Sequence, residues 1–179
     1  MTGAPEPLVG ERVLLEPWDE RRRDDFAALA ADPRVMRFVG RGKPWSPSEA
    51  DEAFERELAH WREHGFGWRG MVERRSGSWL GFVGLNYVPP GGGVPASEVE
   101  IGWWLVPSAW GRGYASEGAA LVRDEAFERV GLERIVARCQ VANAASRAVA
   151  ERIGMTLAYE TRGRYGERVA VYALARPPA

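Results

Sequence analysis

The sequence predicts one mixed α/β (α+β) domain in which helices flank a mostly antiparallel central sheet. Short apolar runs with strand-like alternation recur along the chain, and segments with helical periodicity lie between them. No linker divides the 179 residues, a length that suits one domain with an ordinary core. We therefore expect a single domain over residues 8–176, with flexible termini at 1–7 and 177–179.

Two helices are predicted in the N-terminal third. Residues 19–31 have an amphipathic pattern whose apolar side includes Phe26. Ser46 and Glu49 have the spacing of a capping box, with a proline at the first helical position between them. This second helix is expected to run to about His64, where a glycine follows.

The remaining elements follow from alternation, apolar periodicity and the turn residues between the runs. Strands are expected at residues 12–17, 66–73, 79–87, 98–106, 134–141, 156–160 and 169–174, and further helices at 116–130 and 144–153.

The segment between the strand at 98–106 and the helix at 116–130 has the clearest functional pattern. Gly111 and Gly113 allow a tight bend and a close approach to a ligand. The N–H groups of the loop and of the first helical turn then point at one spot, with the positive end of the helix dipole behind them. This layout predicts an anion cradle that suits a pyrophosphate. The alternative is a tight turn without a ligand.

Two common phosphate loops do not fit this segment. The dinucleotide fingerprint requires a third glycine where Ser116 stands, which argues against a Rossmann oxidoreductase. The nucleoside triphosphate loop requires Gly-Lys-Ser/Thr, and Lys43 is the single lysine of the chain.

Residues 110–115, Trp-Gly-Arg-Gly-Tyr-Ala, instead resemble the acetyl-CoA loop of the GNAT superfamily N-acetyltransferases. The family pattern is Gln/Arg-x-x-Gly-x-Gly/Ala, and Trp110 departs from it at the first position. This form of the loop is similar to the branch that contains the ribosomal-protein N-terminal acetyltransferases (RimJ/RimL-like).

A second motif of the same family follows in the expected order. Asn143 and Ser146 match its Asn-x-x-Ser/Ala start, and Glu151, Gly154 and Met155 match its Glu-x-x-Gly-Phe-like end. Taken singly, these residues are also typical of helix caps. Two motifs in register make the resemblance specific, and it covers essentially the whole chain.

The resemblance implies the GNAT fold, in which a splayed central strand pair grips the pantetheine arm and residues 98–106 form one of the pair. It implies an acetyl-CoA-dependent N-acetyltransferase that uses acetyl-CoA as cosubstrate and no metal. The implied cofactor-binding residues are Leu105, Val106, Gly111, Arg112, Gly113, Tyr114, Ala115, Ser116, Asn143 and Ser146.

Glu100 is the candidate general base. Alternation places it on one face of its strand among apolar neighbours, which are expected to raise its pKa toward a useful value. The resemblance implies a strand glutamate that acts through a water. The alternatives are a glutamate at a solvated edge or one paired with an arginine.

Ser146 is the candidate acid for the leaving thiolate. Many family members place a tyrosine acid in the helix after the Asn-x-x motif, and that position is Ala150 here. The ribosomal-protein branch implies a serine at the motif position, where a hydroxyl would stabilise developing negative charge. The alternative is that Ser146 only caps the helix.

Aromatic and histidine residues bear on the acceptor side. Trp45, Trp61 and Trp68 flank the regions that shape the acceptor pocket in this fold, which predicts an aromatic-walled pocket. His60 and His64 lie four residues apart, too few for a metal site, so a solvated helix face is expected.

Composition limits the partners. The net charge of −1 gives nucleic-acid binding no global support, and no run approaches the roughly 18 apolar residues of a membrane span. The single cysteine, Cys139, excludes an intrachain disulfide and lies in an apolar run, where a buried thiol is expected. Without an apolar signal segment, we expect a cytoplasmic protein. The resemblance also allows a homodimer.

The acceptor class stays open: a protein N-terminus, an amino acid or a small amine. Two other functions fit the same fold. One is a non-catalytic acyl-CoA-binding or sensor module, and the other an O-acyl or longer-chain acyltransferase.

Overall fold

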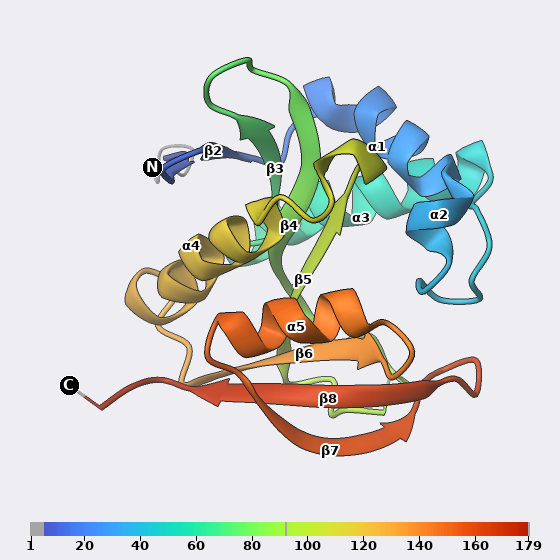
Figure 1. Ribbon diagram of the computed structural model, residues 1–179, viewed down its shortest axis with the longest axis vertical. Coiled ribbons are helices and arrows are strands. Elements are labelled where there is room, and N and C mark those ends of the chain that lie inside the picture. Colours follow the sequence, from blue (N-terminus) through green and yellow to red (C-terminus); the bar gives the residue numbers. More distant parts are fainter. Residues whose placement is uncertain (1–5, 92, 179) are drawn as a thin grey trace.

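The computed structural model describes residues 6–91 and 93–178 and arranges them around one eight-stranded sheet (Figure 1). The strand order is β1-β2-β3-β4-β5-β6-β8-β7, and every neighbouring pair is antiparallel except β5 and β6. The predicted mixed α/β class with a mostly antiparallel sheet is confirmed. Of the flexible termini expected at 1–7 and 177–179, residues 1–5 and 179 lie outside the described residues.

The strands are β1 (Leu8–Val9), β2 (Val13–Pro17), β3 (Trp68–Glu73), β4 (Trp79–Tyr87), β5 (Val99–Leu105), β6 (Arg134–Gln140), β7 (Thr156–Arg162) and β8 (Arg168–Ala175). The helices are α1 (Arg23–Ala31), α2 (Pro33–Met36), α3 (Pro47–His64), α4 (Tyr114–Glu128) and α5 (Ala144–Arg152), with 3-10 turns η1 (Glu20–Arg22) and η2 (Pro107–Ala109). The sequence pattern does not predict β1 or α2, and α4 begins two residues before its predicted start at Ser116.

Helices cover both faces of the sheet. In Figure 1, α4 and α5 lie in front of the strands and α3 lies behind them. Ile101 of β5 packs in the core beneath α4 and α5. Trp104 of the same strand packs beneath α1 and α3 with an aromatic cluster formed by Trp18, Phe26, Phe54 and Phe82. The alternation expected along this strand is therefore confirmed.

The sheet parts between β5 and β6. These parallel strands share one register pair, Glu100 opposite Val136, whereas β4–β5 and β6–β8 each share seven. Figure 1 shows β5 and β6 running in clearly different directions. The splayed central pair implied by the family resemblance is thus present.

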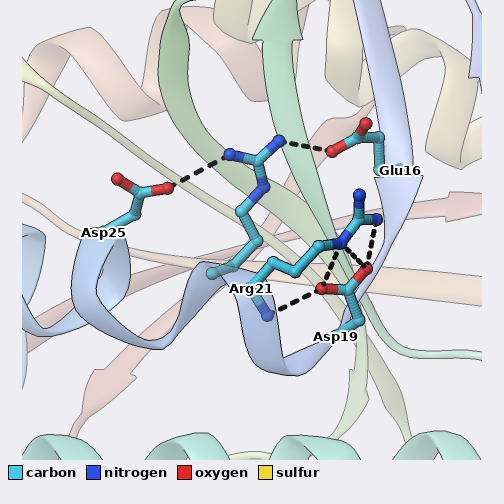
Figure 2. Close-up of polar contacts among 5 residues, drawn as sticks. Glu16, Asp19, Arg21 and Asp25 are labelled. Carbon is cyan, nitrogen blue, oxygen red and sulfur yellow. Dashed lines mark hydrogen bonds and ion pairs between the residues drawn. The ribbon is translucent and has the colours of Figure 1, made fainter.

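The entry of α1 is fixed by side chains of the preceding turn. The Asp19 carboxylate accepts from the backbone N–H of Arg21 at 2.8 Å and also from its guanidinium. Arg22 donates to Glu16 of β2 and to Asp25 of α1. Figure 2 shows these carboxylates close to the η1 turn. Together they hold α1 over the aromatic cluster, although partly exposed pairs of this kind each contribute about 1 kcal/mol or less.

The helix α3 begins and ends as its sequence predicts. The Ser46 hydroxyl accepts from the N–H of Glu49, and the Glu49 carboxylate accepts from the N–H of Ser46. Gly65 follows the helix at φ 70°, a conformation in which a side chain would be strained. The capping box and the C-terminal glycine are confirmed.

A buried ion pair holds α4 against the sheet. Arg69 of β3 is 0% exposed and Glu125 of α4 is 2% exposed by side chain, and Arg69 Nε lies 2.9 Å from Glu125 Oε2. Arg129 donates to the same carboxylate at 2.7 Å. The position of α4, and of the loop before it, depends on this pair.

Replacing Glu125 by leucine is expected to lower the free energy of unfolding by about 3–5 kcal/mol, because Arg69 would remain buried without its counter-charge. The double variant Arg69→Met/Glu125→Leu should recover most of that loss, since no buried charge is left. Urea unfolding of the two single variants and the double variant measures this. Additive losses in the double variant would contradict it.

Candidate active site

The loop before α4 forms an open cradle. Gly111 and Gly113 have φ values of 69° and 82°, and Gly113 is the N-cap of α4. Among the described residues, no side chain caps this end, so the first-turn N–H groups face outward. The Ser116 hydroxyl is buried and also has no partner within the described chain. These unpaired donors, beside glycines without a Cβ, fit a diphosphate.

Two arginines bring positive charge to the cradle. Arg12 Nη1 donates to the carbonyl of Arg112 at 2.9 Å, and both guanidinium groups lie within 5.4 Å of the Tyr114 ring centre. Arg12 Nε also bonds Glu117 Oε2 at 2.9 Å, which ties the chain just before β2 to the first turns of α4. The sequence analysis missed Arg12, because a hundred residues separate it from the loop.

Trp110 fastens the loop to the end of β5. Its indole Nε1 donates to the carbonyl of Leu105 at 2.8 Å. Tryptophan at this position, where the family pattern has Gln or Arg, therefore links the loop to the strand.

Backbone groups of β5 face the gap between the splayed strands. Val106 donates to the carbonyl of Leu80 at 2.9 Å, so even-numbered positions of this strand bond to β4 and odd-numbered positions face β6. Beyond the single β5–β6 pair, the N–H groups of Trp103 and Leu105 point into the gap. The N–H of Val106 is already bonded and its carbonyl accepts from the N–H of Ala109 at 2.9 Å, so a ligand contact at Val106 would come from its side chain or from the second lone pair of that carbonyl.

The second motif starts α5 on the other side of the gap. Asn143 is the N-cap, and its Oδ1 accepts from the N–H of Ser146 at 3.1 Å. Ser146 takes part in the cap through its backbone, and its hydroxyl bonds to none of the described residues. Ala150 is fully buried. The side-chain cap of α5 therefore comes from Asn143, and the Ser146 hydroxyl is not used for capping.

A pocket of about 660 Å³ opens on the opposite face of the sheet, between α3, β4, β5, β6 and residues 163–167. Trp45, Trp68 and Trp104 line it, which agrees with the expected aromatic walls. Trp61 is not among its lining residues and instead donates to the carbonyl of Trp68.

Glu100 faces this pocket where the strands part. Its Oε2 accepts from Arg138 Nη2 of β6 at 2.7 Å, and both side chains are about one-fifth exposed. Of the alternatives open at the sequence level, pairing with an arginine is the one the structure shows.

A second carboxyl group lines the same pocket from α3. Glu57 is 5% exposed, and its Oε1 accepts from Asn86 Nδ2 at 2.7 Å. Its Oε2 is buried and has no partner in the described chain, and burial raises the pKa of Glu57 to about 8. The sequence analysis missed this residue. Its signal was a position on the same helical stripe as the buried Ala53 and Phe54.

His60 lies one helical turn after Glu57. Its Nδ1 lies 2.8 Å from the carbonyl of Phe66, its Nε2 is buried, and both this histidine and His64 line the pocket. The solvated face predicted for the two histidines is therefore wrong for His60. Burial lowers the pKa of this imidazole. No cluster of three potential metal ligands occurs among residues 6–91 and 93–178.

Cys139 is a buried thiol, as its apolar surroundings predict. It lies on β6 with its side chain buried, and burial raises the pKa of Cys139 to about 12. In the part of the chain that the structure describes, no helix has the length and apolarity to cross a membrane.

Residues 12–156 match the family profile described as "acetyltransferase (GNAT) domain". An acetyltransferase of Agrobacterium tumefaciens is 31% identical in sequence, covers 98% of both chains and superposes with a TM-score of 0.82. The RimL ribosomal L7/L12 alpha-N-protein acetyltransferase, in complex with coenzyme A, shares the fold at a TM-score of 0.79 and 20% identity, over 96% of this chain and 98% of that one.

The FsC-acetyl coenzyme A-N(2)-transacetylase of Aspergillus fumigatus is 32% identical over 161 residues. The match covers 81% of this chain and 63% of the fungal protein, so this chain spans less than two thirds of that relative.

The buried Glu57 makes stability depend on pH. Its pKa is about 8 in the folded protein against an ordinary 4.5, so the protonated form favours folding. This contribution is complete below the ordinary value and is lost as the pH rises toward 8. Glu57→Gln, which cannot ionise, should gain stability relative to the wild type between about pH 5 and pH 8.5. The expected gain is at least about 1.4 kcal/mol, one pKa unit.

Urea unfolding of both proteins at the two pH values measures this gain. Parallel pH profiles for wild type and variant would show that Glu57 does not titrate abnormally.

Proposed function

Because this chain belongs to the GNAT acetyltransferase family, we propose that it transfers an acetyl group from acetyl-CoA to a primary amine by direct attack in a ternary complex. One observation carries the proposal. The gap between β5 and β6 has an uncapped glycine cradle at one end and a carboxylate-bearing pocket on the other face of the sheet. Two substrates can therefore approach the same gap from opposite sides.

The loop and the strand edge would hold acetyl-CoA. The first-turn N–H groups behind Gly113 and the nearby Arg112 suit the pyrophosphate. The open N–H groups of Trp103 and Leu105 suit the amides of the pantetheine arm, which can pair with a strand edge like a short extra strand. Asn143 positions the start of α5 beside this path.

The acceptor would enter through the aromatic pocket. Its volume of about 660 Å³ lies within the range of small-molecule sites, which favours a small amine over a protein N-terminus or a bulkier acceptor. Glu100, held by Arg138 where the strands part, would take a proton from the amine through a water.

Acetyl-CoA supplies the acetyl group as a thioester. A carbon–nitrogen bond forms as the carbon–sulfur bond breaks, one proton leaves the nitrogen toward Glu100, and the Ser146 hydroxyl donates to the leaving thiolate. Holding both reactants in place lowers the activation barrier by several kcal/mol, so modest acid–base groups suffice.

A non-catalytic acyl-CoA-binding module is the second candidate, and the buried Ala150 at the position of the family's tyrosine acid favours it. Incubation with acetyl-CoA and a panel of amines separates the two. Release of free thiol together with acetylated amine supports the enzyme, and tight binding without thiol release supports the module. The homodimer and the cytoplasmic location stay predictions.

The variant Gly113→Val should weaken acetyl-CoA binding at least tenfold. A branched side chain would stand in the cradle, at a φ of 82°, with its Cβ 3.1 Å from Arg12 Nη2. Gly131→Val is the matched control, because Gly131 has a φ of 80° and open space around it. Calorimetry on both folded variants measures the affinity. Equal affinities in the two would count against the cradle.

The variant Ser146→Ala should lower kcat by roughly tenfold to a thousandfold, since one oxyanion donor is worth up to about 2.7–4 kcal/mol. Its melting temperature should barely change, because the side-chain cap of α5 comes from Asn143. Asn143→Ala provides the contrast and should cost about 0.5–2 kcal/mol of stability. A Ser146→Ala variant with intact kcat would remove the hydroxyl from the mechanism.

A further inference from the structure

Two buried polar atoms on α3 have no hydrogen-bond partner among the described residues. The Phe66 carbonyl can only accept, so His60 Nδ1 carries the proton and Nε2 of the neutral ring presents a lone pair. Nε2 of His60 and Oε2 of Glu57 are both buried without a hydrogen-bond partner among the described residues, one helical turn apart. Buried polar atoms are almost always bonded, so this pair indicates a missing donor.

The chemistry of the missing group follows from these atoms. It must present at least two hydrogen-bond donors, one for the ionised carboxylate of Glu57 and one for the imidazole nitrogen of His60. A positive charge suits it best, because Glu57 has no ion-pair partner in the described chain and is buried. The Tyr87 ring lies 5.8 Å from the His60 ring and adds an aromatic face of the kind that attracts cations.

This group is not at the reacting end of the pocket. Asn86, which bonds Glu57, stands directly opposite Glu100 in the β4–β5 register. Asn86 therefore contacts Glu57 on one side and has Glu100, where β5 and β6 part, as its neighbour on β5. We therefore expect a nitrogen held at Glu57 to lie on the α3 side of Asn86, away from the gap proposed for the thioester.

We propose that Glu57 and His60 form a subsite for a second, cationic nitrogen of the acceptor, so that the acceptors are diamines acetylated at the nitrogen that reaches the gap. This rests on the proposed function of the same pocket. One ammonium of the diamine donates to Glu57 Oε2 and His60 Nε2, and its carbon chain lies along the aromatic wall that includes Trp104. The other nitrogen reaches the gap beside Glu100.

Binding at this subsite couples to protonation. Charged and titratable groups from four segments line the pocket together with Glu57. They are Arg56, His60, Glu63 and His64 of α3, Glu100 of β5, Arg138 of β6, and Arg164 and Glu167 of the segment after β7, with the phenols of Tyr87 and Tyr165. Because burial raises the pKa of Glu57 to about 8, the empty pocket holds a protonated carboxyl at neutral pH. A bound ammonium requires the ionised form, so diamine binding near pH 7 should release a proton.

Calorimetric titration with diaminopropane, diaminobutane and diaminopentane tests the subsite without turnover. Each diamine is compared with the monoamine of the same length, in two buffers of different ionisation enthalpy. We expect at least one diamine to bind tenfold or more tightly than its monoamine, with proton release. Glu57→Gln should abolish both the preference and the release.

Glu63→Gln is the matched control, since it makes the same Glu-to-Gln change at a side chain that is 74% exposed on the same helix and also lines the pocket. It should keep the preference within about threefold, less than one kcal/mol. Equal binding of diamines and monoamines, or a preference that survives in Glu57→Gln, would overturn the subsite.

Thiol release from acetyl-CoA with the same amines separates the two proposals. The ratio of kcat/KM for diamine over monoamine should fall at least tenfold in Glu57→Gln. Acetylation of monoamines without any diamine preference would sink the subsite alone. Diamine binding without acetylation of any amine would count against the transferase and leave the subsite supported.

Discussion

The parting of β5 and β6 after one register pair is the constraint on which the rest of this structure depends. Unpaired backbone groups inside a protein are costly, so a sheet opens in its middle only where something else satisfies them. Here Trp110 satisfies the carbonyl of Leu105, while the N–H groups of Trp103 and Leu105 point toward the gap, beyond the β5–β6 register pair. A ligand that carries amides along an extended arm supplies the partners that a neighbouring strand would otherwise give.

Because the strands do not hold the two sides of the gap together, other contacts must. On one side, the Arg69–Glu125 pair and the Arg12–Glu117 pair hold α4, and with it the glycine loop. On the other side, Asn143 caps α5 and accepts from the N–H of Ser146, which fixes the position of that serine. Across the gap itself, Arg138 reaches Glu100. The groups proposed for chemistry therefore sit on the ends of rigid elements, where their positions are well determined.

Sequence patterns predicted those parts of this arrangement that depend on local rules. The capping box at Ser46 and the alternation along β5 each follow from interactions within a few residues, and both are present. The strand β1 has two residues and α2 has four, too short to show a period. The positions of Arg12 and Glu57 in the site depend on which distant segments meet. Those contacts arise from tertiary packing. They cannot be predicted from the helical stripe that contains Glu57 or from a single arginine such as Arg12.

The two carboxylates of the pocket differ in one respect that organises its chemistry. Glu100 has its counter-charge within the protein, from Arg138, and stands where the strands part. Glu57, on the α3 side of the pocket, has a single partner among the described residues, the amide donor of Asn86. A carboxylate whose charge an arginine already compensates does not need a cation from the ligand. A buried one without a counter-charge gains most from a ligand that brings one. The pocket thus separates the carboxylate proposed for proton transfer from the one proposed for recognition, and Asn86 contacts the second and is the cross-strand neighbour of the first.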